Sequence, residues 1–189
     1  GNIYSSNATL TNVTFSGNYA DSGGGIANVA DGGTGSPTLI NTILWANEAI
    51  TGTQIYNADV TPVISYTLVQ SDTLNDIYNT GTAAVTYGPG ILTDDPLFAN
   101  PIAATAAPTT TGNYRLPPNS SAIDVGDNNA YNDLSWITND LDGNPRQTDG
   151  DADSSAVVDM GAYEAGTKIC GILASETYTF TNEGGVSIQ

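Results

Sequence analysis

The chain repeats one segment at a fixed distance. Residues 9–15 (TLTNVTF) return 29 positions later as residues 38–44 (TLINTIL), and residues 63–69 (VISYTLV) form a weaker copy about 24 further on. Repeats of about 20–50 residues are typical of solenoids, in which each repeat buries its apolar face only against its neighbours. Every part of this repeat reads as strand or turn, so the sequence predicts an all-β, right-handed parallel β-helix. Short strand-like stretches precede the three copies, at residues 2–4, 25–27 and 54–56.

Asparagine recurs at two matching places in the first two copies. Asn12 and Asn41 interrupt the strands, whereas Asn18 and Asn47 follow them, and each pair is separated by the same distance as the two copies. Residues one period apart stack in a solenoid, and stacked amides can donate and accept hydrogen bonds along its axis. We therefore expect two asparagine ladders, Asn12–Asn41 and Asn18–Asn47. The alternative is that each Asn only marks a turn, because Asn tolerates left-handed backbone.

Composition is typical of a turn-rich extracellular β protein. The 189 residues include 21 Gly and 9 Pro, yet 39% are hydrophobic, which is enough for a core. With 20 acidic residues against three basic ones, the net charge is −17. Such a charge excludes nucleic acid and anionic lipid as primary partners. No apolar run approaches the length of about 18 residues that a membrane span needs, so we expect no direct membrane insertion.

The repeats divide the chain into two predicted parts. We expect a β-helix over residues 1–165, and we expect residues 166–189 to be a linker and the start of a following β module. Proline, glycine and asparagine recur too often for a helix. Within the β-helix the predicted parts are regular coils at 1–72, a longer excursion at 73–90, terminal coils and a cap with an irregular acidic character at 91–165, and strands at 114–116, 122–125 and 157–160.

Four motifs occur in order after residue 94: residues 95–98 (DPLF), 113–126 (NYRLPPNSSAIDVG), 140–146 (DLDGNPR) and 158–164 (VDMGAYE). Together they resemble the C-terminal half of the right-handed β-helix repeat proteins of bacterial surfaces, the choice-of-anchor type often carried on type IX-secreted proteins. The resemblance covers about residues 1–165. It implies an extracellular location on the bacterial cell surface, outside the outer membrane, with secretion or anchoring machinery among the partners. It implies no activity, because the family is defined by its architecture.

Catalytic groups are scarce for a polysaccharide-degrading β-helix. The chain has no His, and both Arg115 and Arg146 lie among carboxylates in the motifs above, where we expect structural ion pairs. Asp94 and Asp95 are adjacent, but Asp95 opens a turn before a proline. We therefore expect no enzymatic activity. The alternative is part of a polysaccharide lyase or glycoside hydrolase whose active site lies in coils outside this sequence.

Alternating carboxylates near the end of the β-helix predict a metal site. Asp149, Asp151 and Asp153 occupy alternate positions, and Asp159 follows ten residues after the first. Alternating Asp in a loop lets several hard oxygens converge on Ca²⁺. Ser154 stands at the sixth position, where an EF-hand needs Gly, so the pattern excludes an EF-hand but leaves a looser Ca²⁺ loop open.

Asp140 and Asp142 are expected to form a second cluster or to join the same site from another side. The alternative for both segments is a solvated acidic loop held by turn hydrogen bonds.

Aromatic residues offer a further prediction. Trp45 follows the second repeat strand, so we expect it at an exposed corner, where an indole can stack on a sugar ring. The alternative is that Trp45 and Trp136 cover the ends of the core.

The function that we predict is an adhesin or stalk that presents a rigid face to extracellular polysaccharide or to a cell surface through many weak contacts. A purely structural or secretion-substrate element without a ligand is the third alternative.

Overall fold

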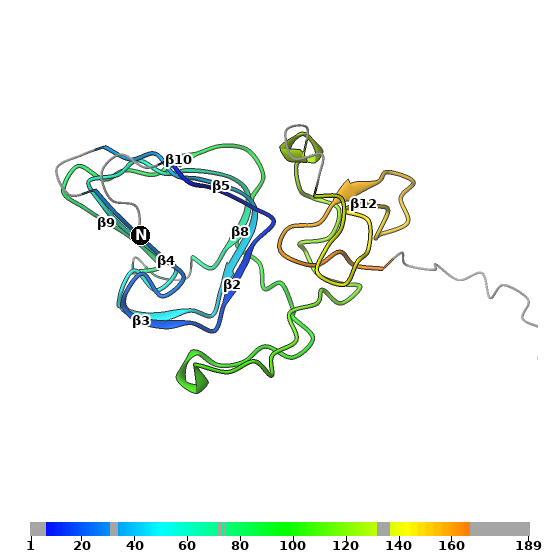
Figure 1. Ribbon diagram of the computed structural model, residues 1–189, viewed down its shortest axis with the longest axis horizontal. Helices are drawn as coiled ribbons and strands as arrows, with labels where there is room; N and C mark the ends of the chain where they lie inside the picture. Colours follow the sequence, from blue (N-terminus) through cyan, green and yellow to red (C-terminus); the bar gives the residue numbers. More distant parts are fainter. Residues whose placement is uncertain (1–6, 31–33, 72, 74, 132–136, 167–189) are drawn as a thin grey trace, which may run out of the picture.

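The computed structural model describes residues 7–30, 34–71, 73, 75–131 and 137–166. These residues form an all-β protein whose parallel strands stack into a solenoid of about three coils, which confirms the predicted β-helix (Figure 1). The first coil contains β1 (Thr9–Thr11), β2 (Thr14–Ser16), β3 (Tyr19–Ser22) and β4 (Ile26–Val29). The second contains β5 (Thr38–Trp45), β6 (Glu48–Thr51) and β7 (Ile55–Ala58). The third contains β8 (Val63–Val69) and β9 (Ile77–Thr80), and the short strands β10 (Thr86–Tyr87) and β11 (Ile91–Leu92) continue the stack.

The coils enclose a triangle when they are viewed along the stacking axis (Figure 1). One sheet has the order β1-β5-β8-β10, with β2 paired to β5 and β11 to β8, and smaller sheets pair β3 with β6 and order β4-β7-β9. Leu10 pairs with Leu39, and Ile26 pairs with Ile55, so the first two coils keep the repeat distance that the sequence shows.

The next coil is shorter. Strand β7 pairs with β9 so that Asn57 lies beside Asn79, at a sequence separation of 22. The prediction of a longer excursion at residues 73–90 is therefore wrong: β9 and β10 lie inside that stretch and belong to the stack.

Aliphatic side chains fill the inside of the triangle. Leu39, Leu44 and Ile55 of the second coil are fully buried, and they pack with Ile64 and Val69 of the third. These positions stack in columns because the register places equivalent residues of successive coils above one another.

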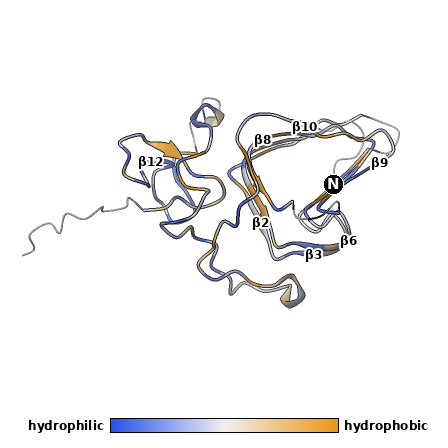
Figure 2. Ribbon diagram, turned by 180° about the vertical axis from the view of Figure 1, so that it is seen from behind, coloured by the Kyte–Doolittle hydropathy of each residue, from blue (hydrophilic) through white to orange (hydrophobic). Residues whose placement is uncertain are grey.

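A second apolar cluster lies outside the triangle. Ile43 and Leu68 are also fully buried, but they pack against residues that follow the solenoid and not against the inner cluster. Side chains alternate across a strand, so β5 directs Leu44 inward and Ile43 outward. Both faces of the strand thus carry apolar side chains that are covered. Figure 2 shows the hydropathy of each residue along the chain. The outer members of this cluster are Phe98, Leu116, Ala122, Ile123, Met160 and Ala165.

The covering residues belong to the C-terminal portion, by which we mean residues 93–166 without the undescribed residues 132–136. Its regular elements are the 3-10 helices η1 (Ala104–Ala106) and η2 (Asn128–Tyr131) and the antiparallel strands β12 (Gln147–Thr148) and β13 (Val157–Val158). It packs beside the triangle (Figure 1).

Several predictions for this portion are therefore wrong. Residues 122–125 lie largely in a turn, residues 114–116 are not strand, and only residues 157–158 of the last predicted strand pair. Residues 2–4, Trp136 and all but the first residue of the linker and module predicted at 166–189 lie outside the described residues. No helix in the described part of the chain is long and apolar enough to cross a membrane.

Candidate metal centre

The loop that follows β12 folds around its own carboxylates. The two oxygens of Asp149 accept hydrogen bonds from the backbone N–H groups of Asp153 (3.1 Å) and Ser154 (3.0 Å). Asp151 Oδ1 accepts a second hydrogen bond from the Asp153 N–H, at 3.0 Å. Ala152 and Ser154 adopt left-handed backbone (φ 65° and 77°), which closes the loop tightly. The loop thus directs two of its carboxylates toward one place.

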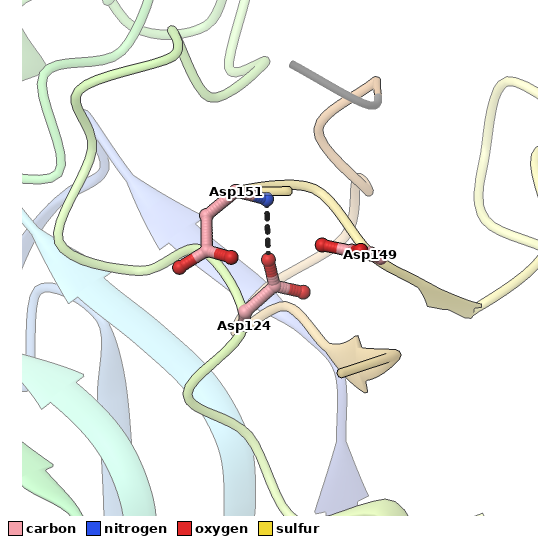
Figure 3. A group of neighbouring side chains, drawn as sticks. All are labelled: Asp124, Asp149 and Asp151. Carbon is pink, nitrogen blue, oxygen red and sulfur yellow. Dashed lines mark hydrogen bonds between the residues drawn. The ribbon is translucent and has the colours of Figure 1, made fainter. Parts of the chain in front are cut away.

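Asp124 completes the cluster from a distant segment. Its Oδ2 accepts a 2.6 Å hydrogen bond from the Asp151 N–H, and oxygens of Asp124, Asp149 and Asp151 all lie within 4.8 Å of one another (Figure 3). Gly150 permits this approach, because a Cβ there would lie 3.1 Å from Ile123 and 3.3 Å from Asp124 Oδ2. Sequence reasoning missed Asp124, since it lies far from Asp149 along the chain and was expected in a strand.

The electrostatics of the cluster favour a cation. Burial raises the pKa of Asp124, and the neighbouring charges of Asp151 and Asp149 raise it further, against the lowering effect of backbone hydrogen bonds. Asp124 Oδ1 is buried and has no hydrogen-bond partner. A buried carboxylate oxygen without a partner costs free energy, and Ca²⁺ prefers such oxygen ligands. The three carboxylates therefore fit a calcium ion.

The structure places the other two predicted ligands of this loop elsewhere. Asp153 Oδ1 accepts a 2.7 Å hydrogen bond from the N–H of Ser155 within the loop. Asp159 is buried, with 1% of its surface exposed, and accepts hydrogen bonds from the N–H groups of Asp124 (2.8 Å) and Ala165 (2.5 Å). Both carboxylates organise the backbone near the cluster, and neither belongs to it.

Asp140 and Asp142 do not form the expected second cluster. Asp142 forms a two-point ion pair with Arg115, whose guanidinium lies 4.8 Å from the ring centroid of Tyr163. Burial alone raises the pKa of Asp140, but hydrogen bonds from the Glu164 N–H and from Asn144 outweigh burial and bring the pKa below its usual value. The Asp140 carboxylate stabilises a turn, as the alternative interpretation predicts, because it accepts hydrogen bonds from the N–H groups of Asp142 and Asn144. The Asp142 carboxylate is held by its ion pair with Arg115.

Asp159 and Glu164 form a buried acidic pair, which contacts the candidate metal centre through the hydrogen bond from the Asp124 N–H to Asp159. Glu164 accepts hydrogen bonds from Arg146 Nη1 (3.2 Å) and from the Asp159 N–H (3.0 Å). Burial raises the pKa of Asp159 to about 7 and that of Glu164 to about 8, and the negative charge of Asp159 contributes to the rise at Glu164. Raised carboxyl pKa values are also found in active sites. Here, however, only 1% and 6% of the two residues are exposed, so a polymeric substrate cannot reach them.

One of the two expected asparagine ladders forms. Asn18 Nδ2 donates a 2.8 Å hydrogen bond to Asn47 Oδ1 between the first and second coils. Asn12 and Asn41 occupy equivalent bends with left-handed backbone (φ 54° and 50°), but their amides do not bond to each other. Asn41 exchanges two hydrogen bonds with the backbone of Asp127.

Asn12 likewise donates to the carbonyl oxygen of Asp159, at 3.2 Å. The prediction of a ladder between Asn12 and Asn41 is therefore wrong. These side chains point outward, toward the C-terminal portion, and not along the axis.

The structure also contains an asparagine ladder that was not predicted from the sequence. Asn28 donates to Asn57, and Asn57 donates to Asn79, each at 2.9 Å, across all three strands of the β4-β7-β9 sheet. The available signal was the tripeptide Ile-Tyr-Asn, which occurs at residues 55–57 and again at 77–79.

Trp45 is the last residue of β5 and pairs with Ser16 of the first coil. It is half-buried and packs against the outer cluster that includes Ile43 and Phe98. The structure thus places Trp45 beside the C-terminal portion and not at a freely exposed corner.

Comparisons of the chain with protein-family models, with curated proteins and with solved structures found no match. The resemblance to the choice-of-anchor β-helix proteins therefore stays a prediction.

Proposed function

We propose that this chain is a non-catalytic, Ca²⁺-stabilised β-helix segment of a secreted or cell-surface bacterial protein, in which it acts as an adhesin or stalk with a rigid face. The observation that carries the proposal is the convergence of the carboxylates of Asp124, Asp149 and Asp151, together with a buried oxygen of Asp124 that has no hydrogen-bond partner. A bound Ca²⁺ would offset most of the negative charge of this cluster, in a chain with a net charge of −17.

The position of the cluster gives the cation a structural role. The N–H of Asp124 donates to the Asp159 side chain, and the Asp159 carbonyl accepts from Asn12 of the first coil. A cation held by Asp124 would therefore stabilise the segment that fastens the C-terminal portion to the solenoid. Extracellular modules bind Ca²⁺ with dissociation constants of about 0.1–1 mM, so a weak site is enough in that environment.

Several features support a non-catalytic role. The buried pair Asp159 and Glu164 is inaccessible, and the two arginines of the described residues, Arg115 and Arg146, are each in an ion pair. Asp95 accepts a hydrogen bond from the N–H of Leu97, which is the turn role expected from the sequence. Nothing in these contacts assembles an acid and a base on an open surface.

The partners that suit this architecture are extracellular polysaccharide or a cell surface. The solenoid exposes Tyr19, Ile50 and Tyr78 on different strands, so it offers repeated shallow contacts that become effective through multivalency. Secretion or anchoring machinery is the further partner that the family resemblance implies.

Thermal unfolding tests the cation. We expect about 10 mM Ca²⁺ to stabilise metal-free protein by about 1.4 kcal/mol if the dissociation constant is about 1 mM, which raises the Tm by about 3–6 °C. Asp124→Asn and Asp149→Asn should abolish the increase, whereas Asp94→Asn, which changes an exposed acid of the same type, should retain it. An equal increase in all four proteins would refute the site.

Gel filtration with a panel of acidic and neutral polysaccharides tests the adhesive role. Intact polymer that co-elutes with the Ca²⁺-loaded protein supports an adhesin. Shortened polymer would overturn the non-catalytic proposal. If every polymer elutes independently of the protein, the adhesive role is excluded and only the stalk role is left.

A further inference from the structure

The sheet formed by β4, β7 and β9 turns one face to the core and the other away from it. The inward side chains pack in the inner cluster, and they are Ile26, Ile55 and Ile77. Side chains alternate along a strand, so the residue after each of these isoleucines points outward. Those residues pair across the sheet and are Ala27, Tyr56 and Tyr78. The C-terminal portion packs on another side of the triangle, away from β9, in views from both sides (Figures 1 and 2).

This outer face carries no charge. None of the residues of β4, β7 and β9 is acidic or basic, whereas the sheet of β3 and β6 exposes Asp21 and Glu48. The other outward residues of the face are Val29, Ala58 and Thr80. In a chain with a net charge of −17, an acidic partner is repelled and a basic partner is drawn to the acids of other surfaces. An uncharged face therefore suits an uncharged partner.

Two tyrosine rings form the centre of the face. The rings of Tyr56 and Tyr78 are nearly parallel (6°), with their centroids 6.0 Å apart, and 41% of Tyr78 is exposed. The sheet ends at β9, because the chain leaves the stack after β11 and forms the C-terminal portion. Within the described strands, no further coil covers the second face of the Tyr78 ring. On the other side Tyr56 pairs with Ala27, whose methyl group covers less of the ring than a third tyrosine would.

Hydrogen-bonding groups lie beside the rings. Asn79 ends the long ladder: its Oδ1 accepts a hydrogen bond from Asn57, and its Nδ2 donates to no residue in the described part of the chain. Asn79 is exposed, so this donor is accessible to a ligand. An aromatic ring packs against the C–H groups of a sugar, and an amide bonds to its hydroxyl groups. The face thus combines the two kinds of contact that a sugar needs.

We propose that this face binds a neutral polysaccharide of equatorially substituted sugars, such as a β-linked glucan, with one sugar ring stacked on Tyr78. The proposal rests on the adhesive role proposed above, and it assigns that role to one face and to one class of polymer. Sugars of this class carry C–H groups on both faces of the ring and hydroxyl groups around its rim. They therefore match an apolar ring with a polar donor beside it. Carboxylates on the polymer would be repelled by the acidic chain.

Electrophoresis in native gels that contain a soluble polymer tests the proposal, because a bound polymer slows the strongly acidic protein. Hydroxyethyl cellulose and carboxymethyl cellulose form a matched pair of probes, since they share a glucan chain and differ in charge. We expect the first polymer to slow the protein and the second to leave its mobility unchanged at low salt. Raising NaCl from about 0.05 M to about 0.5 M should leave binding to hydroxyethyl cellulose nearly unchanged, because no ion pair contributes to it.

Variants of the rings locate the contact. Tyr78→Ala should weaken binding to hydroxyethyl cellulose about fivefold to tenfold, as expected for truncation of an aromatic residue at the centre of an interface. Tyr78→Phe keeps the ring and should retain most of the binding. Tyr19→Ala is the matched control: Tyr19 is 60% exposed but pairs with Glu48 in the charged sheet, so this variant should bind like the original chain. If circular dichroism shows that Tyr78→Ala has lost its β structure, Tyr78→Leu replaces it, because leucine is bulky but has no flat ring.

The possible failures are distinguishable. If Tyr78→Ala and Tyr19→Ala weaken binding equally, the assignment to this face is overturned, although the adhesive role stands. If hydroxyethyl cellulose does not slow the original chain, this proposal fails, and the adhesive role fails with it only when the wider panel of polymers also elutes independently. Sedimentation velocity checks the remaining occupant: a dimer of the original chain that Tyr78→Ala abolishes would show that a second copy covers the face, which would also overturn the proposal.

Discussion

Asn41 is the side chain through which the second coil holds the C-terminal portion. It is fully buried, adopts left-handed backbone and bonds to Asp127 through Nδ2 (3.1 Å) and Oδ1 (2.7 Å). Its own carbonyl also accepts a 2.8 Å hydrogen bond from the Gly161 N–H. Replacing Asn41 by Ala keeps the backbone contact and removes both side-chain contacts.

The expected cost follows from two parts. Left-handed backbone costs an ordinary L residue about 1–2 kcal/mol more than it costs Asn or Gly. The Asp127 N–H loses its partner, at about 1–3 kcal/mol if it stays buried. The Asp127 carbonyl keeps the hydrogen bond from the Ala130 N–H, so the loss of its second bond costs only about 0.5–1.5 kcal/mol. Asn41→Ala should therefore lower the free energy of unfolding by about 4 kcal/mol. Asn41→Gly, which avoids the backbone strain, should cost about 1 kcal/mol less.

Urea unfolding followed by hydrogen exchange of the C-terminal portion measures this effect. Asn12→Ala is the matched control, because Asn12 has the same left-handed bend (φ 54°) but makes only one hydrogen bond to that portion and leaves Oδ1 without a partner. It should cost about 1–2 kcal/mol less than Asn41→Ala. If both Ala variants lose the same stability, or if exchange of the Asp127 amide is unchanged in Asn41→Ala, the hydrogen bonds do not fasten the C-terminal portion and the reasoning fails.

Two further predictions concern the same interface. The pKa values of Asp159 and Glu164 rise from 3.8 and 4.5 to about 7 and about 8 in the folded chain, which therefore binds more protons than the unfolded chain between these values. The stability that these protonated groups contribute in acid should therefore be lost as the pH rises toward 8, by at most about 1.4 kcal/mol per pH unit for each group. Urea unfolding over a pH series measures this loss. Glu164→Gln should make it smaller, whereas Asp153→Asn should leave it unchanged. Gly161 (φ 93°) would place a Cβ 2.7 Å from Thr14 Oγ1 and 2.8 Å from Ile43 Cδ1, whereas Gly143 (φ 87°) faces open space. Gly161→Ala should therefore destabilise the protein by about 1–3 kcal/mol more than Gly143→Ala, and equal costs would show that only backbone strain matters.

The coils were predictable because residues that stack in a solenoid are separated by one repeat length in the sequence. Leu10 and Leu39, or Ile26 and Ile55, are stacked neighbours in space and also equivalent positions of a repeat. The shorter third coil was harder to see, since a smaller offset at β9 replaces the offset that relates the first two coils. The change of period made residues 73–90 resemble an excursion, although they continue the stack.

The candidate metal centre and the C-terminal portion depend on contacts that no periodicity records. Asn12 reaches the carbonyl of Asp159 near the other end of the described chain, and Asp124 meets a loop that begins well after it in the sequence. The alternating acids correctly drew attention to Asp149 and Asp151, but alternation could not show that Asp153 caps a turn or that Asp142 pairs with Arg115. One local signal was available for the docking: residues 42–45 (TILW) read as an unbroken strand with apolar residues on both faces, which indicates that both faces are covered.

That two-faced strand also lets the C-terminal portion contact all three described coils. A stack gains stability from interfaces between neighbouring coils, and about three repeats are the minimum for a solenoid. The C-terminal portion bonds to Asn12 in the first coil and Asn41 in the second, and its apolar cluster includes Leu68 of the third. It therefore braces successive coils along one side of the triangle, so that separating any two of them also breaks contacts with the brace. The acidic cluster at Asp124 lies within this brace, so a cation bound there would stabilise the whole stack and not only its own loop.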